Sequence, residues 1–86
     1  MTRDEIFRKI REWICDREGY SIEDIQEKTD LRRDLHYDSL DVVEVAILVE
    51  DKFKEEKIAI DVTDDDLAKF TTIGAIVDVI AKKLEG

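Results

Sequence analysis

One stretch of the sequence decides the fold: Leu35-His36-Tyr37-Asp38-Ser39-Leu40-Asp41-Val42-Val43-Glu44. Here a polar loop gives way to an apolar and acidic helix, which is predicted to begin at Asp38 or Ser39 and to end near Phe53. Asp38 is the expected N-cap, and Asp41 has the spacing of a capping-box acid. An Asp-Ser pair at this point puts the Ser39 hydroxyl on an exposed corner, beside backbone N–H groups without intrahelical partners. Ser39 is therefore the candidate for a modified side chain.

This helix is predicted to have two unlike faces. At about 100° per residue, one quarter of the circumference holds Leu48 and the acidic residues Asp41, Glu44, Asp51 and Glu55. The other side holds Val42, Val43, Ala46, Ile47, Val49 and Phe53, with Glu50 projecting among them. The pattern predicts one face against the core and one acidic face.

Two further long helices follow from apolar spacing. The first starts with a capping box at residues 2–5 and ends near Gly19. The last is capped by Thr71 or Thr72 and carries an apolar stripe of Ile73, Ile76, Val77, Ile80 and Leu84. Residues 20–37 form a long connection, predicted to be ordered with at most one short turn of helix.

The segment after the central helix is predicted to hold one short helix. Residues 58–62 alternate as an extended segment pinned to the core, and Thr63 caps a helix that runs through Phe70. The expected fold class is all-α: a bundle of three main helices plus one short helix. Its core is expected to consist of Ile6, Phe7, Ile10, Ile14, Leu35, Val43, Phe53, Ile73, Ile76 and Ile80.

Composition narrows the class of partner. The 86 residues suit one domain, expected to span 1–86, and the net charge of −9 argues against nucleic acid and for basic protein partners. The single cysteine, Cys15, cannot form an internal disulfide, and no apolar run is long enough for membrane insertion. The charged N-terminus lacks the apolar stretch of a secretion signal, so a cytoplasmic protein is expected. The chain is also expected to be a monomer. No metal site is predicted, because residues 61–72 lack the glycine and glutamate of a calcium loop.

The chain resembles the acyl carrier proteins. The resemblance is carried by residues 35–44, by Glu50-Asp51-Lys52-Phe53 and by Lys69-Phe70-Thr71-Thr72-Ile73, and it covers nearly the whole chain. It implies that Ser39 receives 4′-phosphopantetheine from coenzyme A through a phosphopantetheinyl transferase, and that the thiol of this group carries an acyl chain as a thioester. It also implies a carrier that is not an enzyme, in agreement with a serine hydroxyl that lacks an adjacent base.

The same resemblance implies a recognition face on the central helix. The acidic positions matched to basic patches on acyl-transferring or synthase enzymes are Asp38, Asp41, Glu44 and Asp51. The apolar positions matched to contacts with partners or with the acyl chain are Leu40, Val43 and Ile47. Exposed charges mainly steer encounter, which suits a shuttle between enzymes. An acyl chain of moderate length is expected to insert between the helices.

Three departures from the family pattern indicate a specialised member. His36 and Tyr37 replace a glycine and a small residue, Lys52 interrupts the acids, and residues 53–71 are longer than usual and lack a proline. The expected role is in fatty-acid or related polyketide or lipid biosynthesis. One alternative is an aminoacyl, D-alanyl or peptidyl carrier, and a more distant one is an unmodified acidic helical adaptor, in which Ser39 is only an N-cap. His36 is interpreted as a loop residue in preference to a general base.

Overall fold

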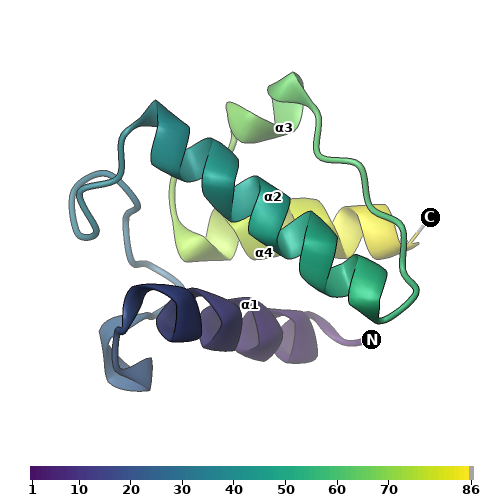
Figure 1. Cartoon of the computed structure of the whole chain (residues 1–86), viewed down its shortest axis with the longest axis horizontal. Coiled ribbons are helices and arrows are strands. Elements are labelled where there is room, and N and C mark those ends of the chain that lie inside the picture. The colour runs from purple at the N-terminus through teal and green to yellow at the C-terminus, as the bar shows by residue number, and fades with distance from the viewer. Residues whose placement is uncertain (86) are drawn as a thin grey trace.

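Three long helices and two short ones account for the regular structure of residues 1–85, the part of the chain that the computed structural model describes. The long helices are α1 (Arg3–Glu18), α2 (Ser39–Glu55) and α4 (Ile73–Glu85); the short ones are the 3-10 turn η1 (Ile22–Asp24) and α3 (Asp64–Leu67). In Figure 1, α2 crosses in front of α4 while α1 runs along one side of both. The predicted all-α fold class of three main helices and one short one is confirmed.

Each long helix begins at a polar cap that the sequence predicts. In α1 the Glu5 N–H donates to Thr2 Oγ1 at 3.2 Å, and the Thr2 N–H donates back to Glu5 Oε1 at 3.0 Å. In α4 the Ala75 N–H donates to Thr72 Oγ1 at 3.1 Å, which makes Thr72 the cap in preference to Thr71. These bonds satisfy N–H groups that have no partner within the first turn of a helix.

Both α1 and α2 end at a residue with a left-handed backbone conformation, which is a glycine after α1 and a lysine after α2. Gly19 ends α1 with φ 77°, and its N–H donates to the Cys15 carbonyl at 2.8 Å. After α2, Lys57 adopts φ 65°, although an L-residue with a side chain disfavours this region. The Lys57 N–H donates to the Lys54 carbonyl and the Ile58 N–H to the Phe53 carbonyl, both at 2.9 Å. This pair of bonds is the Schellman motif, which usually has glycine at this position.

The core lies where α1, α2 and α4 meet. Phe53 is fully buried and meets Trp13 edge to face, with ring centroids 5.0 Å apart and planes at 89°. Of the predicted core residues, eight are buried: Ile6, Phe7, Ile10, Ile14, Phe53, Ile73, Ile76 and Ile80. Leu35 is half-buried. Val43 is 36% exposed and Val45 is buried in its place, so the prediction for Val43 as a core residue was wrong.

The long connection between α1 and α2 is held against the start of α4. The Gly74 N–H donates to the Glu27 carbonyl at 2.8 Å, and a Cβ on Gly74 would lie only 3.0 Å from that oxygen. Arg3 bridges the Glu27 and Asp78 carboxylates, with its closest contacts at 2.6 and 2.7 Å. The Ile73 N–H donates to the Thr29 carbonyl at 3.0 Å. The connection is therefore ordered, as predicted, with η1 as its one short turn of helix.

The segment that follows α2 packs on the core without forming a strand. Ile58, Ile60 and Val62 are half-buried against the core, which confirms the predicted pinned segment. α3 ends at Leu67, three residues earlier than the predicted end at Phe70. The helix ends early because Phe70 packs into the core, where only 4% of this residue is exposed.

Candidate functional site

Ser39 occupies the first position of α2, directly after its N-cap. The Asp41 N–H donates to the Asp38 carboxylate at 2.9 Å, and the Asp38 N–H donates to the Asp41 carboxylate at 2.9 Å. This reciprocal pair is the capping box that the sequence predicts. Both carboxylates are directed at backbone N–H groups, so the Ser39 side chain is not needed as a cap and lies exposed on the corner.

The hydroxyl of Ser39 has a cation as its neighbour. Arg32 Nη2 donates to Ser39 Oγ at 3.4 Å, and both side chains are exposed. A guanidinium has no acceptor atom and stays protonated, so it cannot take the serine proton. The side chain beside Ser39 therefore supplies positive charge and not base catalysis. Sequence reasoning missed Arg32; the available signal was a pair of arginines seven and six residues before the serine in a strongly acidic chain.

The Asp38 carboxyl is held in its charged form. Its pKa is lowered, first by the hydrogen bond from the Asp41 N–H and further by the positive charge of Arg32. An ionised carboxylate at the N-terminus of a helix also interacts favourably with the helix dipole. The corner that carries Ser39 thus has the Asp38 carboxylate and the Arg32 guanidinium as charged neighbours.

His36 and Tyr37 have conformational roles next to the corner. His36 is exposed and adopts φ 58°, the left-handed region in which glycine has no steric cost. Ser39 Oγ has its hydrogen bond to Arg32 and none to His36. Tyr37 is 7% exposed, and burial raises the pKa of its phenol. Tyr37 therefore packs into the interior while His36 turns the chain toward α2.

An apolar stripe runs along α2 from Ser39. Leu40 is 65% exposed, Val43 36% and Ile47 49%, which are large fractions for such side chains in a protein of this size. Their spacing of three and four residues places them on one side of the helix. The prediction that Val43 and Ile47 face the core was wrong: Val42, Val45, Ala46, Val49 and Phe53 are the buried residues of α2. The apolar arc of α2 is wider than the surface that α1 and α4 cover.

The acidic positions flanking the stripe differ in their surroundings. Arg17 of α1 pairs with Glu44, with Nη2 and Oε2 2.7 Å apart, and also donates to the Glu44 carbonyl at 3.2 Å. Asp41 is half-buried in the capping box, whereas Asp51 is exposed. Glu50, which projected awkwardly in the sequence pattern, accepts a hydrogen bond from the Val62 N–H at 2.8 Å. Glu50 therefore has a structural role and does not belong to the acidic face.

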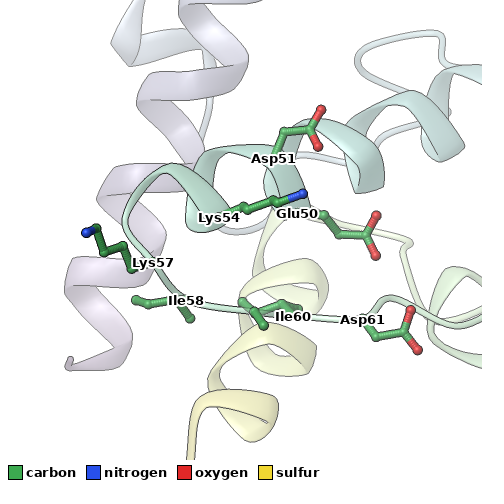
Figure 2. A pocket seen from close by; sticks show the side chains of 8 residues that line it. Glu50, Asp51, Lys54, Lys57, Ile58, Ile60 and Asp61 are labelled. Atoms are coloured by element: carbon green, nitrogen blue, oxygen red, sulfur yellow. The ribbon is translucent and has the colours of Figure 1, made fainter.

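One hollow on the surface lies far along α2 from Ser39. Its volume is about 570 Å³, and it is lined by the end of α2 and the segment after it: Glu50, Asp51, Lys54, Lys57, Ile58, Ala59, Ile60 and Asp61. Figure 2 shows Lys57 at one end of this hollow and Asp61 at the other. Ser39 does not line it, and the Ser39 side chain is exposed.

Within residues 1–85, no three His, Cys, Asp or Glu side chains gather closely enough to hold a metal ion. None of the helices described has the length and apolar character needed to cross a membrane.

Comparison with known proteins agrees with this arrangement. Residues 8–80 match the family model described as a phosphopantetheine attachment site. An acyl carrier protein from Thermotoga maritima is 37% identical over 83 residues, covering 96% of each chain. One from Picosynechococcus is 37% identical over 79 residues, which is 92% of this chain and 91% of the relative.

Solved structures show the same fold. The crystal structure of an acyl carrier protein from Thermotoga maritima superposes with a TM-score of 0.75 at 25% identity, over 96% of this chain and 91% of that one. An acyl carrier protein from Enterococcus faecalis gives a TM-score of 0.72 at 29% identity, over 96% and 99%.

Proposed function

Because the chain belongs to the acyl carrier protein family, whose cofactor is 4′-phosphopantetheine, we propose that Ser39 is the residue to which this group is attached. The exposed hydroxyl on the first turn of α2, with Arg32 Nη2 3.4 Å away, is the observation that carries the proposal. The corner suits the group, because a phosphate there would meet a guanidinium and the N-terminus of a helix. When bound, the group supplies a thiol that holds an acyl chain as a thioester.

Ser39 acts in this proposal as a tether point. During transfer from coenzyme A its Oγ forms the new bond to phosphorus, and the bond to adenosine 3′,5′-bisphosphate breaks. The hydroxyl proton goes to a base of the transferase, because the neighbour of Ser39 is a guanidinium that cannot accept it. The chain then presents its cargo without catalysing the chemistry itself.

The apolar stripe of Leu40, Val43 and Ile47 is proposed as the docking face for the transferase and for acyl-transferring or synthase enzymes. Its support is its exposure and its continuity with the Ser39 corner. The acidic positions Asp38, Asp41, Glu44 and Asp51 flank it and favour partners with basic patches. Fatty-acid biosynthesis, which is typical of the family, is the proposed setting.

Intact-mass analysis after incubation with coenzyme A and a phosphopantetheinyl transferase tests the attachment. One phosphopantetheine is expected to be added to the unaltered chain and to Ser21→Ala, but none to Ser39→Ala. Ser21 is the matched control because it is the only other serine and is also exposed. The absence of an adduct on the unaltered chain, or its persistence in Ser39→Ala, would rule out the assignment.

The docking face has its own test. Ile47→Glu is expected to lower the kcat/KM of loading by about tenfold, because an apolar contact at a small interface is replaced by a charge. Ile22→Glu is the control: Ile22 is 43% exposed but lies on η1, away from the stripe. Equal kcat/KM values for the two variants would contradict the proposed face.

A further inference from the structure

The contact between Arg32 and Ser39 depends on the fold of the loop before α2. The Asp30 carboxylate accepts hydrogen bonds from the Arg32 and Arg33 N–H groups, each at 2.9 Å. The Asp30 N–H in turn donates to the Asp34 carboxylate at 2.7 Å. The loop is thus a compact turn, and the backbone that carries Arg32 is held at a defined place.

Two further backbone hydrogen bonds fix this turn relative to α2 and α4. The Leu31 N–H donates to the Thr71 carbonyl at 3.0 Å, next to a backbone bridge between Asp30 and Thr72. The Tyr37 N–H donates to the Leu31 carbonyl at 2.9 Å and so closes the loop just before α2 begins. Leu31 is fully buried, and together with these hydrogen bonds its burial holds the next residue, Arg32, beside the first turn of α2.

Arg32 carries a positive charge at the corner where a phosphate on Ser39 would lie. A phosphodiester on Ser39 would add one negative charge next to Asp38, whose carboxylate is already held as the N-cap. Like charges at this spacing repel each other, and a cation within hydrogen-bond reach offsets the repulsion. Arginine is well suited because its guanidinium offers several donors in a plane that matches phosphate oxygens.

We propose that Arg32 is a positioning residue that binds the phosphate of the phosphopantetheine joined to Ser39 and so orients the arm where it leaves the protein. The proposal rests on attachment at Ser39 and adds to it an assigned partner for the phosphate. Arg33 provides a matched control. It is also exposed and its backbone bonds to the same Asp30 oxygen, but its side chain makes no hydrogen bond to Ser39.

The first test is phosphorus NMR of the loaded protein. Arg32→Gln is expected to shift the ³¹P resonance of the phosphodiester, whereas Arg33→Gln removes the same charge and is expected to leave it in place. The difference between Arg32→Gln and the unaltered protein should shrink at high salt, because an exposed ion pair is screened. No shift in either variant, or equal shifts in both, would overturn the proposal.

The second test uses the unaltered chain, so it applies even if Arg32→Gln is loaded poorly. On loading, exchange of the Arg32 guanidinium protons with water is expected to slow, and that of Arg33 to stay unchanged. Equal exchange of Arg32 in the loaded and unloaded forms would refute the role of Arg32. The attachment at Ser39 is judged separately: failure of the unaltered chain to load at all refutes the attachment, and with it the basis for Arg32.

Discussion

Lys57 offers a sharp test of how α2 ends. Its φ of 65° lies in a region that costs a residue with a side chain about 1–2 kcal/mol, whereas glycine adopts it freely. Glycine loses more backbone entropy on folding, which costs about 0.5–1 kcal/mol relative to alanine. The difference predicts that Lys57→Gly is more stable than Lys57→Ala by about 0.5–1 kcal/mol. Both variants remove the same charge, so the comparison isolates the backbone.

Lys54 supplies the matched control three residues earlier. It is also exposed and lies within α2, where the backbone is right-handed. Here alanine has the higher helix propensity, so Lys54→Gly is expected to be less stable than Lys54→Ala by about 0.5–1 kcal/mol. The order of glycine and alanine is therefore expected to reverse between two neighbouring lysines.

Urea unfolding followed by Trp13 fluorescence measures these differences, because Trp13 contacts the buried ring of Phe53. For a domain of this size, 0.5–1 kcal/mol corresponds to a change in Tm of about 2–8 °C. The same order of glycine and alanine at both lysines would refute the reasoning. That result would mean that the left-handed backbone conformation of Lys57 costs no free energy or that the Schellman motif is not formed in solution.

Three further predictions concern other contacts. His36→Gly is expected to raise the free energy of unfolding by about 0.5–1 kcal/mol, because His36 also has a positive φ; an unchanged urea midpoint would contradict this. Glu50→Ala is expected to cost about 1–3 kcal/mol, because the Val62 N–H loses its charged acceptor; Glu50→Gln, which keeps an acceptor oxygen, is expected to recover most of the urea midpoint. Lys83 lies 2.6 Å from Asp66 and is the main cause of the low pKa of that carboxyl, about 2 against an ordinary 3.8. Because the pKa of Asp66 is lower in the folded protein than in the unfolded chain, the ionised carboxylate stabilises the fold above about pH 4. This stabilisation is lost as the pH falls from about 4 to 2. The urea midpoint is therefore expected to fall more steeply over this pH range in the unaltered protein than in Lys83→Met. Parallel pH profiles would show that the pair does not set this pKa.

Much of the fold could be predicted because its signals are local. A capping box joins residues three apart, so Thr2, Asp38 and Thr63 mark their helices without knowledge of the rest of the chain. Helical apolar spacing likewise predicts α1 and α4. The end of α3 was less predictable, because burial of Phe70 in the tertiary structure outweighs the local preference for helix.

The faces of α2 show where this local reasoning fails. The helix has more apolar side chains than its neighbours can cover, and the periodicity cannot choose which of them remain exposed. Packing against the rest of the fold selects Val45 for the interior and leaves Val43 and Ile47 outside. The same packing brings Val62 to Glu50 and so explains an acid that seemed misplaced.

The sequence by itself determined the three main helices, the caps of α1 and α2 and the exposed place of Ser39 at the start of α2, because each depends on residues within one or two helical turns. The apolar periodicity did not decide which side chains form the exposed stripe; the tertiary structure leaves Leu40, Val43 and Ile47 exposed, the positions that the family resemblance implied as contacts. The tertiary structure also decided that Arg32 lies beside Ser39, through backbone bonds that join Leu31 to Thr71 and to Tyr37. Such contacts depend on the path of the whole chain, since they close loops that no local preference specifies.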